Sequence, residues 1–180
     1  MVGSNEQPLP RARRDGRLEP KVVRALRESH LVLLATASGD GRPATTLVSW
    51  LWPVDESRLL LALDRRGLAF RHVTGNPWGA IEVLMGPFVG TLRGSIRLLV
   101  ERLARAPFPC AAAIFEIEEV RRHDVAGVVV VPPSYAFVPA RPQYAETEAA
   151  IVDELALLAE HLCADVVSSS RRLPASGARE

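Results

Sequence analysis

The feature that most limits the possible folds of this chain is the short spacing between its first strand-like segments. Residues 31–38 (LVLLATAS), 44–52 (ATTLVSWLW) and 58–64 (RLLLALD) are apolar runs rich in strand-forming residues. The segments GDGRP (39–43) and PVDES (53–57) separate them, and both are typical of turns. Parallel strands need crossovers of a dozen or more residues, so these strands are predicted to be antiparallel neighbours. A doubly wound dinucleotide-binding fold is excluded, since no GxGxxG motif follows a strand either.

Downstream of these strands the chain continues with one short helix and further strands. The helix is predicted at roughly residues 67–75, and Asn76-Pro77 ends it because the residue before proline disfavours helical backbone. Gly90 and Gly94 lie inside a later strand, where glycine indicates a bulge, a barrel corner or the close approach of a ligand. The strand pattern returns in three segments, at 78–85, 88–101 and 110–125.

Helices are predicted at both ends of the strand-rich region. Residues 19–30 place apolar side chains at helical spacing, and Pro20 suits a first helical turn. Residues 146–162 carry acids in the first turn and an apolar stripe from Ile151 to Leu162. Six closely spaced strands, a short helix after the third strand and helices at both ends predict a mainly β protein. We expect a small, closed antiparallel barrel with peripheral helices.

The remaining segments are predicted to be irregular. Pro132 and Pro133 prevent a sheet ladder beyond the last predicted strand. Residues 1–18 are polar and basic and are expected to form a flexible arm, and residues 164–180 a flexible tail. Residues 19–163 are therefore expected to form one domain.

Composition and charge narrow the class of protein. At 180 residues, with 48% hydrophobic and 24% charged residues, the chain can bury a core and is not disordered. A net charge of +1 argues against a nucleic-acid-binding protein. No apolar run reaches the roughly 18–20 residues that span a bilayer, and no signal peptide is recognised. We therefore expect no membrane partner. Cys110 and Cys163 follow no metal-binding or disulfide-rich pattern, so we also expect no metal site and a reduced, cytoplasmic location.

Cations gather at one strand-to-helix corner of this nearly neutral chain. Arg65 and Arg66 end the third predicted strand, Gly67 allows close backbone approach, and Arg71 follows one turn into the helix. Free N–H groups and the positive end of the helix dipole favour an anion there. Arginine adds paired donors that suit phosphate oxygens. The corner is either a phosphate site or a solvated turn.

Hydroxyl groups mark the second predicted strand. Thr45, Thr46 and Ser49 interrupt an otherwise apolar run and can hydrogen-bond a polar heteroaromatic ring, whereas Trp50 and Trp52 share the face opposite Ser49. The alternative is a strand built from good strand formers with core aromatics. The four histidines follow no metal-ligand or haem-ligand spacing, and structural or surface roles are expected for them.

In their order and spacing, these segments resemble the pyridoxamine 5'-phosphate oxidase-like, FMN-binding split-barrel family. The resemblance spans roughly residues 20 to 125. Four features carry the resemblance. The first is an opening hairpin, and the second is a block in which a strand, a basic corner, a helix, an Asn-Pro pair and another strand follow one another. The third and fourth are two later strands. The corresponding stretches are LLATASGDGRPATTLVSW (33–50), RLLLALDRRGLAFRHVTGNPWGAIEVL (58–84), TLRGSIRLLVE (91–101) and FEIEEVRRHD (115–124).

The resemblance implies a six-stranded antiparallel split barrel, a homodimer and an FMN-dependent oxidoreductase whose small-molecule substrate binds between subunits. A nicotinamide is one electron donor that this chemistry admits. The implied cofactor-binding residues are Thr45, Thr46, Leu47, Val48, Ser49 and Trp50 along the ring, Leu63 and Asp64 at the strand end, and Arg65, Arg66, Gly67, Leu68 and Arg71 at the phosphate.

The chain departs from the family pattern at the corner. Gly67-Leu68-Ala69 stands where the family usually has Ser-Arg-Lys, so the nearby arginines are expected to replace the missing serine and lysine. PPSYAFVPARPQ (132–143) does not match the family's substrate-binding residues, and a vitamin B6 oxidase is not expected. Two alternatives stay open. One is a split-barrel protein with a deazaflavin or haem, and the other is a non-catalytic flavin-binding protein.

Overall fold

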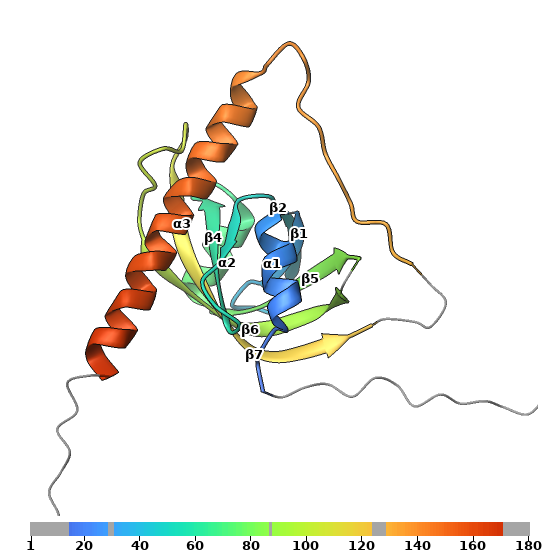
Figure 1. The fold of residues 1–180 in the computed structure, drawn as a ribbon, viewed down its shortest axis with the longest axis vertical. Helices are drawn as coiled ribbons and strands as arrows, with labels where there is room; N and C mark the ends of the chain where they lie inside the picture. Colours follow the sequence, from blue (N-terminus) through green and yellow to red (C-terminus); the bar gives the residue numbers. More distant parts are fainter. Residues whose placement is uncertain (1–14, 29–30, 87, 124–128, 171–180) are drawn as a thin grey trace, which may run out of the picture.

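The computed structural model describes residues 15–28, 31–86, 88–123 and 129–170, and these form a seven-stranded antiparallel sheet with helices around it (Figure 1). The sheet order is β2-β1-β5-β6-β7-β4-β3. The strands are β1 (Val32–Ala37), β2 (Pro43–Val48), β3 (Leu51–Pro53), β4 (Arg58–Asp64), β5 (Trp78–Met85), β6 (Phe88–Val100) and β7 (Cys110–Arg122). The helices of the described part are α1 (Pro20–Glu28), α2 (Leu68–Gly75) and α3 (Gln143–Ser170).

The mainly β class is confirmed, but the prediction of six strands is wrong. The predicted strand 44–52 is two strands, β2 and β3, with Ser49 and Trp50 between them. β2 pairs with β1 and β3 pairs with β4, so the two halves of one run lie at opposite edges of the sheet. Two residues cannot bridge the edges of a flat sheet. The sheet is therefore curled, and the chain bends where its edges approach each other.

Two apolar clusters lie on opposite faces of the sheet. Successive residues of β4 alternate between them, with Leu59 and Leu61 on the inner face and Leu60 on the outer face. α1 and α2 pack on the inner cluster, and α3 covers the outer cluster through Ile151 and Leu155 (Figure 1). β4 is consequently buried on both faces, which explains why its sequence is continuously apolar.

Gly94, in the middle of β6, marks a β-bulge, which is one of the three features that the sequence allowed there. The pairing of β6 with β7 shifts register between Arg93 and Gly94. A Cβ atom on Gly94 would lie 1.9 Å from the Glu116 carbonyl oxygen and 3.2 Å from the Ile117 Cα. No side chain fits between the two backbones there, so the bulge requires glycine at this position.

The connection from β7 to α3 is irregular after Pro132 and Pro133, as predicted, and it runs as an extended segment outside the sheet (Figure 1). α3 is longer than the predicted helix 146–162 at both ends. The Glu154 carboxylate of α3 accepts hydrogen bonds from the backbone N–H groups of Ala104 and Arg105, at 2.8 and 2.9 Å. These bonds hold α3 to the connection between β6 and β7.

The chain ends extend past the described residues. Of the predicted arm, residues 1–14 lie outside the described part, whereas Leu18 is buried and its N–H donates to the Glu56 carbonyl at 2.7 Å. Residues 171–180 of the predicted tail also lie outside it. No helix in the described part is long and apolar enough to cross a membrane.

Candidate functional site

A cavity of about 220 Å³ opens where the chain bends from β2 to β3. Four parts of the chain meet at it: the end of β2 with the bend that follows, the end of β4, the start of α2 and the segment that leads into β7. Its walls are formed by Thr46, Leu47, Val48, Ser49, Trp50, Ala62, Leu63, Asp64, Gly67, Ala69, Phe108 and Cys110. The hydroxyl-bearing strand and the strand-to-helix corner, separate in the sequence, therefore share one site.

The bend explains why neighbouring residues of β2 all reach the cavity. In a regular strand, successive side chains point to opposite faces. β2 is an edge strand, paired only with β1, so the backbone N–H and C=O groups of its other side are not used by the sheet. At this edge of the sheet, side chains from both faces of β2 and its unpaired N–H and C=O groups all lie beside the cavity. Residues 46–49 thus present peptide groups and hydroxyls to a ligand.

The structure does not place every predicted cofactor residue in the cavity wall. Eight predicted residues line it: Thr46, Leu47, Val48, Ser49, Trp50, Leu63, Asp64 and Gly67. The other five lie outside the wall: Thr45, Arg65, Arg66, Leu68 and Arg71. Arg65, Arg66 and Arg71 are exposed at the corner beside it, so they are placed to contact a ligand that extends out of the cavity.

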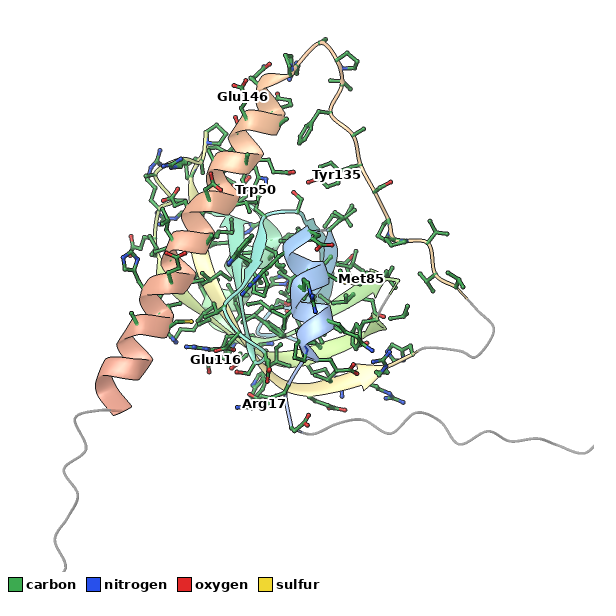
Figure 2. All side chains as sticks on the ribbon, viewed as in Figure 1. Arg17, Trp50, Met85, Glu116, Tyr135 and Glu146 are labelled. Atoms are coloured by element: carbon green, nitrogen blue, oxygen red, sulfur yellow. The ribbon has the colours of Figure 1, made fainter. Side chains whose placement is uncertain are left out.

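One wall of the cavity is aromatic. The Trp50 ring stacks on the Phe108 ring, with 5.6 Å between the centroids and 27° between the planes (Figure 2 labels Trp50). The Arg66 guanidinium lies on Phe108, 4.8 Å from its centroid. Sequence reasoning missed Phe108, Ala62, Ala69 and Cys110. The pairing of β4 with β7, which puts Asp64 opposite Cys110, brings Cys110 and the nearby Phe108 to the site, whereas Ala62 and Ala69 lie on β4 and α2 themselves.

The two adjacent arginines of the corner have different environments. Arg66 binds Asp64 through Nε at 3.0 Å and Nη2 at 2.8 Å, and its backbone N–H donates to the same carboxylate at 2.9 Å. The hydrogen bonds from Arg66 lower the pKa of Asp64. Arg65 instead lies over the Phe70 ring, 5.5 Å from the centroid. Among the described residues, neither Arg65 nor Arg71 has a carboxylate partner, so both charges are available to an anion.

The start of α2 adds backbone donors at the same corner. Gly67 precedes the helix with extended backbone (φ −76°, ψ 162°), and no side chain caps the helix. The first N–H groups of a helix have no partner within it, and they lie at the positive end of the dipole. Gly67 and Ala69, where a serine and a lysine were expected from the resemblance, both line the cavity. At these two positions the cavity wall therefore carries neither a hydroxyl nor an ammonium group.

Cys110, which lines the cavity, and His72, which lies outside its wall on α2, have structural roles. His72 holds α2 to β1, since its Nδ1 lies 3.0 Å from the Oγ1 of the buried Thr36. Burial, with a smaller contribution from the charge of Asp64, raises the pKa of the Cys110 thiol to about 11. This thiol is therefore protonated at neutral pH and is a poor nucleophile. Both cysteines are free.

Residues 18–146 match the family model for pyridoxamine 5'-phosphate oxidase. The chain belongs to this family. Because the matched region includes the β2–β3 bend, the basic corner and every strand, the cavity lies within the family's shared domain. No curated protein matches the chain.

Solved structures show the same fold. One is a crystal structure from Lactobacillus delbrueckii, named as a candidate pyridoxamine 5'-phosphate oxidase. It has a TM-score of 0.52 and 21% identity, covering 61% of this chain and 97% of that one. Another is HupZ of Group A Streptococcus, with a TM-score of 0.51 and 12% identity, covering 63% of this chain and 98% of that one. At these identities the likeness concerns the fold alone.

Proposed function

We propose that this protein is an FMN-binding oxidoreductase of the pyridoxamine 5'-phosphate oxidase class, which acts on a small molecule bound between two copies of the chain. The observation that carries the proposal is the cavity at the β2–β3 bend. It combines an edge-strand backbone, an aromatic wall and a basic helix start in a chain of this family. These are the groups that a planar heteroaromatic ring with an anionic tail requires.

The residues present fit FMN in three parts. The backbone of residues 46–49 and the hydroxyls of Thr46 and Ser49 would hydrogen-bond the polar groups of the ring. Trp50 and Phe108 form the apolar wall. The N-terminus of α2, with Arg65 and Arg71, would hold the phosphate in place of the missing lysine. When bound, FMN supplies two-electron redox chemistry, so the protein needs no catalytic triad.

Arg66 has a positioning role in this proposal. Its guanidinium is held by Asp64 on one side and rests on Phe108 on the other. It thereby links the corner to the aromatic wall and keeps the carboxylate of Asp64 paired next to an anion site. Removing Asp64 would release Arg66 and add net positive charge, whereas removing Arg66 would leave an unpaired carboxylate beside the phosphate.

An exposed apolar face beside the cavity supports a homodimer. Leu47 is 65% exposed and lies directly across from Leu33, which is 36% exposed, on the neighbouring strand. Leu68, at the start of α2, is 51% exposed. Since Leu47 also lines the cavity, a second copy on this face would close the open side of the site. Leu47→Asp is expected to shift the molar mass measured by light scattering from dimer to monomer, and to weaken flavin binding. An unchanged molar mass would exclude this face as the interface.

The described histidines favour a flavin over haem in this cavity, because none of them lines it. His72 is engaged with Thr36, and Nε2 of His123 lies 2.8 Å from Thr91 Oγ1 on another part of the sheet. His161 is exposed on α3. A haem bound at the β2–β3 bend would lack an axial histidine from these residues.

The experiment compares FMN with riboflavin, which has the same ring but no phosphate, in fluorescence titrations of the purified protein. FMN is expected to bind more tightly. Arg65→Ala combined with Arg71→Ala is expected to weaken FMN binding by roughly tenfold or more, and riboflavin binding little, because charged hydrogen bonds contribute about 1.5–3 kcal/mol. Arg93→Ala with Arg97→Ala, on β6, removes the same charge away from the site and should bind FMN normally.

Two results would count against the proposal. If the wild-type protein binds neither flavin, the cofactor assignment is wrong. If the Arg65/Arg71 and Arg93/Arg97 double variants lose FMN affinity equally, the corner is not the phosphate site. Anaerobic mixing of the flavin-loaded protein with a reduced nicotinamide separates an oxidoreductase, whose flavin absorbance bleaches, from a protein that only stores flavin.

A further inference from the structure

Another cavity, of about 550 Å³, lies between α1 and the turn that joins β3 to β4, and we name it the α1 cavity. Its volume is within the range of small-molecule pockets, roughly 300–1,000 Å³. One wall is a side of α1, and the other is the turn at residues 55–57 with Arg17 beside it (Figure 2 labels Arg17). The α1 cavity and the candidate flavin cavity have no lining residue in common.

The α1 wall combines an apolar surface with two cations. Its residues follow positions i, i+3, i+4 and i+7 of the helix, which lie on one face. They are Pro20, Val23, Arg24 and Arg27. Val23 is buried, whereas both arginines are exposed. The same side of the helix therefore offers apolar contact and two guanidinium groups to a ligand.

The opposite wall is held in place by backbone hydrogen bonds to the body of the protein. The N–H of Leu18 donates to the carbonyl of Glu56 at 2.7 Å, and the N–H of Ile117 donates to the carbonyl of Ser57 at 2.8 Å. These bonds come from the segment before α1 and from β7, so they fix the turn on two sides. The cavity thus has a preformed wall facing the helix.

Both carboxylates of the turn wall already have partners. Asp55 accepts hydrogen bonds from Arg58 through Nε at 2.8 Å and from the N–H and hydroxyl of Ser57 at 2.8 and 2.9 Å. Glu56 lies 3.6 Å from Nη1 of Arg17. Each of the two acids is therefore matched by a cation other than those of the α1 wall.

The two arginines of α1 are left without such a match. In the described ranges, no carboxylate lies within ion-pair distance of Arg24 or Arg27. The Arg27 guanidinium instead lies over the Trp52 ring, 5.7 Å from its centroid. Two positive charges thus face one cavity with their hydrogen-bonding capacity toward an anion unused.

We propose that the α1 cavity binds a small organic phosphate, whose anionic group pairs with Arg24 and Arg27 while its apolar part lies on Val23. A phosphate monoester carries about −1.5 to −2 charges at neutral pH, which matches two guanidinium groups better than a carboxylate does. The planar fork of N–H donors of each arginine suits phosphate oxygens. This site is separate from the flavin cavity and does not depend on the proposed function.

The test uses phenyl phosphate as the probe in two-dimensional NMR titrations of the ¹⁵N-labelled full chain, because amide shifts report each site separately. Amides of α1 and of residues 55–57 are expected to shift along one saturable curve. Inorganic phosphate lacks the apolar part, phenol lacks the anion and benzoate carries a single charge. Each of these three is expected to bind the α1 cavity more weakly than phenyl phosphate.

Two double variants make the result specific. Arg24→Gln combined with Arg27→Gln removes the charges but keeps much of the side-chain stems, and is expected to weaken phenyl phosphate binding at α1 roughly tenfold or more. Arg93→Gln with Arg97→Gln on β6 is the matched control and should keep the wild-type affinity. If the first variant does not give a folded spectrum, Arg24→Gln alone, which leaves the contact of Arg27 with Trp52, is expected to lose about threefold or more.

Several outcomes would overturn the inference. They are the absence of saturable shifts in α1, an equal loss of affinity in both double variants, and benzoate binding as tight as that of phenyl phosphate. Shifts confined to residues 46–50 and 67–71 would place the probe at the flavin cavity, which overturns the α1 site but leaves the proposed function standing. Conversely, failure of FMN to bind would remove the proposed function without changing the shifts expected in α1.

Discussion

Restoring the serine that the family usually carries at the corner tests the phosphate site by gain of affinity. Gly67 has φ −76° and ψ 162°, which any residue can adopt, so serine causes no backbone strain. Its Cβ would lie 3.2 Å from the Asp64 carbonyl oxygen, a close contact that a small local shift relieves. Serine also caps a helix better than glycine by a few tenths of a kcal/mol.

The expected gain is modest, because the corner is open to solvent. A hydrogen bond to a charged group contributes about 1.5–3 kcal/mol, and exposure reduces this to about 1 kcal/mol here. FMN should therefore bind about fivefold more tightly to Gly67→Ser than to the wild-type protein. Riboflavin, which lacks the phosphate, should bind both proteins equally.

Gly75→Ser is the matched control for this substitution. Gly75 is the last residue of the same helix, and a Cβ there meets no atom within 4 Å. It should leave both flavin affinities unchanged. If Gly67→Ser improves riboflavin and FMN binding equally, the phosphate does not sit at the start of α2. If it weakens FMN alone, the serine hydroxyl and the phosphate compete for the same space, and the proposed position of the phosphate is wrong.

Three other predictions concern the fold and its thiols. In a denaturant titration, Gly94→Ala is expected to lower the free energy of unfolding by about 3 kcal/mol, because the alanine Cβ would collide with the backbone of β7. Gly86→Ala is the control, since a Cβ there meets no atom within 4 Å, and its free energy of unfolding should be near that of the wild-type protein. Glu154→Gln replaces one of the two carboxylate oxygens that accept hydrogen bonds by an NH2 donor, and the free energy of unfolding from thermal melts is expected to fall by about 1 kcal/mol. An unchanged stability would show that apolar packing alone holds α3. At neutral pH a thiol reagent should label Cys163 quickly and the buried Cys110 slowly. Equal labelling of both thiols in the folded protein would contradict the burial of Cys110. Because the pKa of Cys110 is raised to about 11, burial of its neutral thiol stabilises the folded protein below about pH 9, and this stabilisation is lost as the pH rises toward 11.

The strand pattern was sufficient to predict the mainly β fold, but not the break at the β2–β3 bend. The turns GDGRP and PVDES are recognisable from their glycine, proline and aspartate residues. The two residues at the bend, Ser49 and Trp50, are neither glycine nor proline, so no turn is predicted there. The bend instead results from pairing at both edges of the curled sheet, which involves strands far away in the sequence. A long-range constraint of this kind leaves no local pattern to detect.

The sequence was likewise sufficient to predict part of the candidate site, but not all of the residues that line it. The basic corner and the hydroxyl-bearing strand were recognised as separate features, and the structure brings them to one cavity. Phe108 and Cys110 were missed because they reach the cavity only through the pairing of β4 with β7.

Calorimetric titration of the purified chain with FMN tests the central claim most directly. The described part of each chain has one cavity that combines the edge strand, the aromatic wall and the basic corner. Binding is therefore predicted to saturate at one FMN per chain, with FMN bound more tightly than riboflavin. Absence of saturable FMN binding, or equal affinity for riboflavin, would contradict the assignment of this cavity as a flavin site anchored by its phosphate.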